Sequence, residues 1–258
     1  MGRNLGLAKA QTDILVYADD DILAFPTWLE GIIEAFSNNE DVVLVGGKNL
    51  PKFETDPPYW IQHMWKENEQ HNRILGYLSI LDLGDDMKEI DPHNVYGCNF
   101  SIRKSVLLSA GGFHPDSMPE DVIRYRGDGE TYISRFVFEK GYKALYHPMA
   151  SIYHHVPASR MTVEYFCVRS FNQGISDSYT DIRDGKPERL RSTPIRDGLL
   201  KMIHRIMFFN EEGDRHHRIE EAYRKGYTYH QRQVREDPKI REWVLRDNYL
   251  GQNGRLPL

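Results

Sequence analysis

Three consecutive aspartates, Asp19 to Asp21, directly follow an apolar run that begins at Ile14. Neighbouring carboxylates repel one another, and aspartate is a poor strand former, so this arrangement calls for a compensating interaction. In an extended segment Asp19 and Asp21 point to the same side and can converge on one hard divalent cation such as Mg2+ or Mn2+. The alternative is a solvated acidic turn that caps the following helix. The apolar strand before the aspartates and Pro26 after them favour the metal site.

An α/β sheet is the element that would position these carboxylates, because open α/β sheets bind ligands at the carboxyl ends of their strands. The apolar pattern predicts a buried strand over 14–18 and a second strand over 42–45, which Gly46 and Gly47 end. Between them, residues from Pro26 onward have helical spacing. The predicted core face of that helix consists of Trp28, Leu29, Ile32, Ile33 and Phe36. Asn4 is predicted to cap a short helix that ends at Ala10.

The rest of the chain divides near residue 157. Before it, the pattern predicts a strand and short helix over 95–113, a helix over 129–140 and short strands over 142–146 and 150–153, while 51–92 is less regular. After it, the chain is predicted to be mostly helical and strongly charged. We therefore expect a catalytic domain over 1–157 and a helical extension over 158–258.

Composition excludes several classes of protein. The 258 residues carry a formal net charge of −5, which gives no support for nucleic-acid binding. Cys98 and Cys167 cannot form a disulfide framework, and we expect a cytoplasmic location. No apolar run reaches the length of about 18 residues that a membrane-spanning helix needs. The apolar segment 198–209 could rest on a membrane surface, although packing in the interior is the commoner use of such a helix.

Four motifs in order resemble the GT-A fold glycosyltransferases of family 2, which are inverting and use nucleotide sugars. The run RNLGLAKAQTDILVYADDDI places Arg3, Asn4, Gly6, Asp19 and Asp21 in register with the family's segment around its D-x-D motif. VYGCNFSIRKSVLLSAGGF is similar to its G-x-N segment, and GDGETYISRFVFEKGYKALYHPMASIYHH is similar to its acidic segment with the later P-x-A and His. The resemblance covers about 155 residues and fades after Arg160.

This resemblance implies a fold and a reaction. The fold would be a Rossmann-like mixed sheet, and the reaction would move a sugar from a nucleotide-diphosphate sugar, with UDP expected, to the hydroxyl group of a saccharide, a lipid-linked acceptor or a protein. It implies a divalent cation, Mg2+ or Mn2+, held by Asp19, Asp21 and His154. His154 falls at the family's spacing from Pro148. It places Arg3, Asn4, Asp19 and Asp20 on the donor side, and Gly97 and Asn99 on the acceptor side.

The position of the catalytic base departs from the family pattern. Counting back from Arg135 without gaps puts a glycine, Gly129, where the family has an aspartate. Either Asp128 or Glu130 must then deprotonate the acceptor, and we favour Asp128. Asp128 could instead cap the following helix, and the two roles are compatible.

The resemblance also predicts that the chain is an incomplete fragment. In the family, a nucleotide-binding portion of strands and helices precedes the strand that carries the D-x-D motif, whereas here that strand is the first one predicted. We therefore expect an N-terminally truncated GT-A domain that folds poorly alone. The competing hypotheses are a non-catalytic metal- or sugar-binding module that docks a partner, and a metal-dependent phosphohydrolase, for which short-spaced His/Asp pairs are too few.

Overall fold

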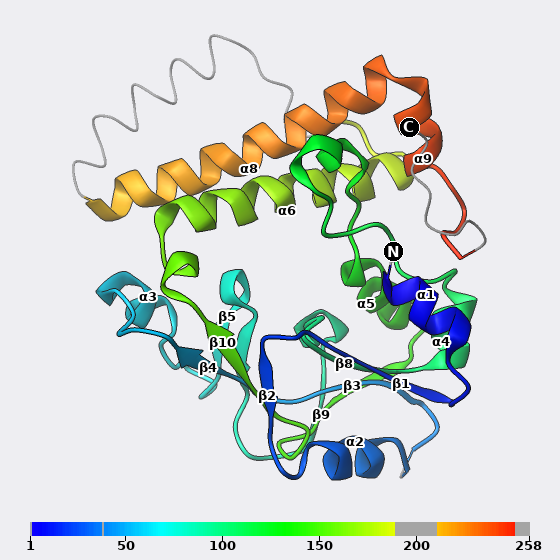
Figure 1. Ribbon diagram of the computed structural model, residues 1–258, viewed down its shortest axis with the longest axis vertical. Helices are drawn as coiled ribbons and strands as arrows, with labels where there is room; N and C mark the ends of the chain where they lie inside the picture. Colours follow the sequence, from blue (N-terminus) through cyan, green and yellow to red (C-terminus); the bar gives the residue numbers. More distant parts are fainter. Residues whose placement is uncertain (1, 38, 189–210, 251–258) are drawn as a thin grey trace. The chain divides into compact units, whose positions relative to one another are not determined.

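The structure is a computed structural model that describes residues 2–37, 39–188 and 211–250. These residues form two compact units. Unit 1 contains the described residues of 2–114, 129–161 and 248–250, and unit 2 contains those of 115–128, 162–188 and 211–247. Figure 1 shows their ribbons. The apolar segment 198–209 of the sequence analysis lies outside the described residues.

Unit 1 is built on two mixed five-stranded sheets. The first has the order β1-β8-β3-β9-β7, in which β3 and β9 are parallel and the other neighbours are antiparallel. Its strands are β1 (Ile14–Ala18), β3 (Val42–Gly46), β7 (Lys88–Ile90), β8 (Asn99–Arg103) and β9 (Lys143–Tyr146). Every residue of β3 is buried, so this strand runs through the interior.

The second sheet has the order β2-β10-β4-β6-β5, with β10 and β4 parallel. Its strands are β2 (Ile22–Ala24), β4 (Asn49–Phe53), β5 (Arg73–Leu75), β6 (Ile80–Asp82) and β10 (Ile152–Val156). Ile152, His154 and Val156 of β10 are buried, whereas Tyr153 and His155 are exposed, as strand alternation requires. His154 therefore points into the protein from this sheet.

The helices of unit 1 cover both faces of the first sheet. The helix α2 (Trp28–Ser37) packs Ile32, Ala35 and Phe36 against β3 on one face. On the other face, α1, α4 and α5 enclose a larger core that includes Leu7, Phe100, Leu107 and Ile133. Figure 1 shows α2 on the side of the sheet opposite to α4 and α5. The bounds are α1 (Gly2–Lys9), α3 (Tyr59–Met64), α4 (Lys104–Ser109) and α5 (Glu130–Glu139), with 3-10 turns at Gly76–Leu78, Pro92–Asn94 and Ala158–Arg160.

The described residues of unit 2 include two long helices and one short helix. The long helices α6 (Val163–Arg183) and α8 (Glu211–Glu236) pack against each other, and α9 (Pro238–Val244) follows α8. The segment 115–128, with a 3-10 helix over Glu120–Tyr125, belongs to this unit. The Trp243 indole donates a hydrogen bond to the Tyr125 carbonyl at 2.9 Å, and the Ser176 hydroxyl donates to the Gly127 carbonyl at 2.8 Å. These bonds attach the segment to α9 and α6.

This architecture confirms the predicted α/β class with a mixed sheet, and three local predictions need correction. Asn4 lies inside α1 rather than capping it. The strand over 14–18 has the predicted bounds but is not a buried strand, because β1 is at the edge of its sheet and only Leu15 is buried. Leu29 and Ile33 of α2 are 58% and 64% exposed, so the helix buries a narrower face than predicted.

The second sheet was not predicted from the sequence, apart from a strand near β10. Its strands within 51–92 are only three residues long, except for β4, which begins at Asn49. The contacts within the chain also group the segment 115–128 with the helices of unit 2, so the units do not follow a single cut in the sequence.

Candidate active site

The three aspartates form a turn between β1 and β2, where the chain leaves one sheet and enters the other. This corrects the prediction of an extended segment. The His155 backbone N–H donates to the Asp21 carbonyl at 2.9 Å, which fixes the turn to β10. Asp19 and Asp20 are exposed, whereas Asp21 is partly buried. The turn therefore still brings Asp21 towards the buried face of β10.

Asp19 lies in a cluster of charged groups in unit 1. Loss of hydration raises the pKa of its carboxyl, although the residue as a whole remains exposed. The Arg3 guanidinium opposes this rise in pKa, the charges of Asp21 and Glu130 add to it, and His154 opposes it. The Asp21 carboxylate thus contributes to the raised pKa of the Asp19 carboxyl.

Asp21 contacts two side chains, Arg160 and His154. Its Oδ2 atom lies 2.9 Å from Nη2 of Arg160, and its Oδ1 atom lies 3.4 Å from Nε2 of His154. The Oδ1 atom is buried and has no hydrogen-bond partner among the described residues. A buried carboxylate oxygen without a donor is costly, so this atom is suited to a ligand.

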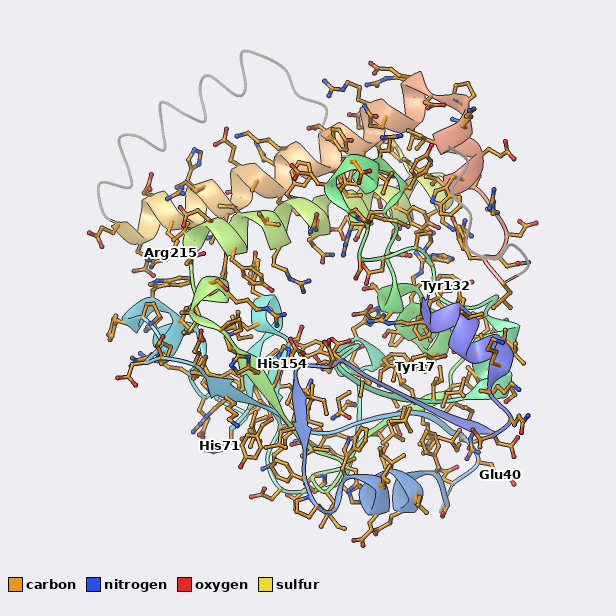
Figure 2. The ribbon with its side chains drawn as sticks, viewed as in Figure 1. Tyr17, Glu40, His71, Tyr132, His154 and Arg215 are labelled. Carbon is orange, nitrogen blue, oxygen red and sulfur yellow. The ribbon has the colours of Figure 1, made fainter. Side chains whose placement is uncertain are left out.

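His154 is held in the state that a metal ligand requires. Its Nδ1 atom lies 2.9 Å from the Leu78 carbonyl, and burial lowers the pKa of the imidazole against the opposing charge of Asp21. In the neutral ring Nδ1–H then donates to Leu78, which leaves the lone pair of Nε2 facing Asp21. Figure 2 labels His154 among the side chains of unit 1. A carbonyl that orients the imidazole in this way is the usual support of a metal-binding histidine.

The residues present therefore fit a divalent cation, although no three-ligand group is already assembled. Among the described residues, no group of three or more His, Cys, Asp or Glu side chains is arranged to hold a metal ion. Asp21 and His154 are close enough to share a cation, while Asp19 is the more exposed of the proposed ligands. The Arg160 guanidinium occupies part of the space, as its Nη1 atom lies 3.4 Å from His154 Nε2.

Arg3 and Glu130 form an ion pair beside this cluster. Nη1 of Arg3 lies 2.8 Å from Oε2 of Glu130, and the guanidinium also lies over the Phe113 ring at 5.4 Å. Gly97 provides room for the pair, because a β-carbon there would lie 2.8 Å from Arg3 Nη2 and 2.9 Å from Glu130 Oε1. The structure thus brings together Arg3, Gly97 and Glu130, three residues that the motifs place in different roles.

Asn4 and Asn99 have structural contacts instead of an open position. The Asn4 amide donates to the Phe113 carbonyl and accepts from the Phe113 N–H, both at 2.9 Å. The buried Asn99 amide donates to Ala150 and Asn49 and accepts from the Trp28 indole. Every polar atom of these two amides already has a protein partner, so we assign neither residue a direct contact with substrate.

Asp128 lies at the end of the 115–128 segment in unit 2. It is only 5% exposed, and Oδ2 accepts a hydrogen bond from the Thr180 hydroxyl at 2.7 Å. The next residue, Gly129, has φ 54° and ψ −124°, a conformation that is essentially restricted to glycine. An aspartate at position 129 would be strained, which gives a physical reason for the displaced carboxylate.

Neither the contact of Arg160 with Asp21 nor the pairing of Arg3 with Glu130 was predicted from the sequence. Arg160 follows His154 by six residues in the run HHVPASR, and nothing in this spacing indicates that its side chain contacts Asp21. Tyr17 also belongs to this neighbourhood, as its hydroxyl lies 3.4 Å from the Arg3 carbonyl, and burial raises its pKa to about 12. The only available signal was the basic residue after a motif that ends in histidine.

Comparison with known proteins supports the resemblance. Residues 2–109 match the family model described as glycosyl transferase family 2. A curated relative is the glucosyl-dolichyl phosphate glucuronosyltransferase of Haloferax volcanii, which is 26% identical over 180 residues, or 70% of this chain and 55% of the relative. The chain thus spans about half the length of this relative. Within the described residues, none of the helices is long and apolar enough to cross a membrane.

Proposed function

We propose that the protein transfers a sugar from a nucleotide-diphosphate sugar to a hydroxyl acceptor, because residues 2–109 match the family model of glycosyl transferase family 2. We further propose that the reaction inverts the anomeric centre and is assisted by Mg2+ or Mn2+. The observation that carries this proposal is the convergence of Asp21 and His154, with an unpartnered buried carboxylate oxygen facing an imidazole lone pair.

The charged residues near the Asp19 to Asp21 turn are proposed to have different roles in binding the donor. When bound, a divalent cation would offset the negative charge that builds on the leaving diphosphate. Asp21 and His154 would hold it, with Asp19 completing the set from the exposed end of the turn. Arg3 supplies positive charge beside Asp19, and Glu130 keeps its guanidinium in place. Asp20, which is exposed, is left for the sugar or ribose hydroxyls.

The catalytic base is assigned to Asp128, with Glu130 as the alternative. In a single inverting displacement, a carboxylate takes the proton of the acceptor hydroxyl on the side opposite to the leaving group. Glu130 already has one oxygen in an ion pair with Arg3, and Asp128 is buried where its carboxylate accepts a hydrogen bond from the Thr180 hydroxyl. The pairing of Glu130 with Arg3 supports Asp128 as the base.

A lipid-linked glycosyl phosphate is the proposed class of acceptor, with a UDP-sugar as donor. The name of the Haloferax relative supports this choice, since that protein is described as acting on glucosyl-dolichyl phosphate. Such an acceptor lies in a membrane. We therefore propose that the protein acts in the cytoplasm, at the surface of that membrane. Transfer to a saccharide or a protein, with none to the lipid-linked acceptor, would contradict this choice.

The test is sugar transfer to a lipid-linked glycosyl phosphate in liposomes, measured together with release of UDP. We expect Asp21→Asn to abolish transfer, while the exposed control Asp86→Asn removes the same charge and leaves transfer intact. Donor binding without transfer to any acceptor would favour the alternative of a non-catalytic sugar-binding module. Absence of donor binding would exclude both.

The roles of Asp128 and Glu130 can be distinguished in the same assay. Asp128→Asn is expected to lower kcat by roughly 100- to 10,000-fold with donor affinity retained, as for loss of a general base. Glu130→Gln is expected to raise the KM for donor, because it releases Arg3. The reverse pattern would transfer the role of base to Glu130.

A further inference from the structure

Arg160 occupies the position in unit 1 where a cation is needed. Its Nη2 atom lies 2.9 Å from Oδ2 of Asp21 and its Nη1 atom lies 3.4 Å from Nε2 of His154. One guanidinium therefore contacts both groups that the proposed function assigns to the divalent cation. Its side chain is 32% exposed and is reached from solvent.

A divalent cation and this guanidinium cannot share Asp21 and His154 without strong repulsion between like charges. Binding of the cation alone would displace Arg160 from Asp21, its ion-pair partner among the described residues. A bound diphosphate would supply an anion at the same place, and an arginine fork matches phosphate oxygens well. The bond between Arg160 and Asp21 is thus a contact whose loss is compensated only when cation and diphosphate arrive together.

We infer that Arg160 is a phosphate-binding residue of the donor site that couples binding of the divalent cation to binding of the diphosphate. This inference rests on the proposed function and extends it to a residue beyond the motifs. Without ligand, Arg160 neutralises Asp21 and closes the cation position. With both ligands bound, it pairs with the diphosphate and leaves Asp21 and His154 to the cation.

The coupling is measured by equilibrium dialysis of Mn2+ against the protein, with and without inorganic pyrophosphate. Pyrophosphate carries the phosphate chemistry of the donor and does not depend on recognition of a nucleoside. Wild-type protein is expected to bind Mn2+ weakly alone and 5- to 150-fold more tightly with pyrophosphate, the usual range of coupling between two sites. Arg160→Met is expected to bind Mn2+ alone more tightly than wild type and to lose most of the effect of pyrophosphate.

Two further variants make the result specific. Arg73→Met removes the same charge from an exposed ion pair with Glu67 at 3.6 Å, and is expected to behave as wild type. Arg160→Lys retains the charge without the planar fork, and is expected to keep the exclusion of Mn2+ while losing part of the gain with pyrophosphate. Circular dichroism of each variant checks that the fold is retained.

The outcomes separate the inference from the function on which it rests. If wild type binds Mn2+ and Arg160→Met binds it with the affinity and coupling of Arg73→Met, the coupling role of Arg160 is overturned and the metal site stands. If wild type takes up no Mn2+ with or without pyrophosphate, the proposed donor site is wrong and the inference fails with it.

Discussion

Asn99 uses its whole side-chain amide to connect three segments of unit 1. It donates to the Ala150 carbonyl at 2.9 Å and to Asn49 Oδ1 at 3.2 Å, and it accepts from Trp28 Nε1 at 3.0 Å. Asn99→Ala would leave these buried groups unpaired, and we expect it to lower the free energy of unfolding by about 2–4 kcal/mol. Urea denaturation measures this loss. The exposed Asn248→Ala is the control, expected to change stability by under about 0.5 kcal/mol.

This variant distinguishes a structural asparagine from one that binds acceptor. If Asn99→Ala is as stable as wild type but raises the KM for acceptor, the residue belongs to the acceptor side, as the motif predicts. A loss of stability with an unchanged KM for acceptor supports the role of Asn99 as a connection between β8, β4 and α2.

His230 makes unit 2 sensitive to acid. It is fully buried in α8, where Nδ1 lies 2.8 Å from the Ser178 hydroxyl, and burial lowers its pKa to about 4. Histidine in an unfolded chain titrates near pH 6.5. Between these two pH values the unfolded chain binds a proton that the folded chain does not, so the free energy of unfolding falls as the pH falls below about 6.5.

The expected loss from His230 is about 2 kcal/mol at pH 5, relative to pH 7.5, where this histidine is neutral in both states. Urea denaturation at the two pH values measures it. His230→Gln is expected to reduce the difference between them, while His216→Gln, an exposed position on the same helix, is expected to keep it. If all three proteins lose the same free energy of unfolding between pH 7.5 and pH 5, His230 does not take up a proton on unfolding.

At the residue scale, the sequence indicated candidate ligands but not their contacts. The pattern after β1 predicted that Asp19 and Asp21 share a cation, and the family resemblance added His154; these roles stay predictions. Burial of Asn99 was not predictable, because the same residue type suits a turn, a substrate contact or a buried bond. The bond from Arg160 to Asp21 was not predictable either, because it depends on the path of the chain after β10.

The crossing of α6 and α8 depends on two glycines. A β-carbon at Gly174 would lie 2.1 Å from the Tyr223 carbonyl oxygen, and one at Gly226 would lie 1.9 Å from the Phe171 carbonyl oxygen. Both clashes involve backbone atoms, so the helices must move apart to relieve them. We expect Gly174→Ala to destabilise the protein by more than about 2 kcal/mol, at the upper end for overpacking.

Gly6 in α1 provides a control of opposite sign. A β-carbon there would have no atom within 4 Å among the described residues, and alanine favours a helix over glycine by about 0.5–1 kcal/mol. Gly6→Ala is therefore expected to raise the melting temperature and Gly174→Ala to lower it, as measured by circular dichroism. A Gly174→Ala protein with an unchanged melting temperature would mean that the helices do not pack this closely.

At the element scale, prediction succeeded where a strand or helix is long enough to show its period. The bounds of β1 were predicted, and β3 and α5 were predicted to within a few residues. Ile133 and Val137 lie on the buried face of α5. The strands β5, β6 and β7 are three residues each, which is too short for an alternating pattern to stand out. Their pairing is set by neighbours that are distant in the sequence.

At the scale of the whole molecule, the chain passes between the two units more than once. Unit 2 takes its segment 115–128 from within the part of the sequence that otherwise builds unit 1, and 248–250 returns to unit 1 after the helices. A single boundary near residue 157 therefore describes the change in composition but not the contacts. The change in composition could be detected in the sequence because charge and helical spacing are local properties. Membership of a unit could not, because it depends on which segments pack together.

A chain that ends after residue 161 tests this organisation. It would retain the sheets and helices of unit 1 but leave 115–128 without the Trp243 bond to Tyr125 and the Ser176 bond to Gly127. It would also lack Leu250, which packs against the main core of unit 1. We expect this chain to melt at a lower temperature than the full chain and to be cleaved rapidly by protease within 115–128, because a segment without its packing partners opens readily. Limited proteolysis followed by mass spectrometry locates the cuts. If 115–128 stays as protected as in the full chain, its partners lie within unit 1 and the division into two units is wrong.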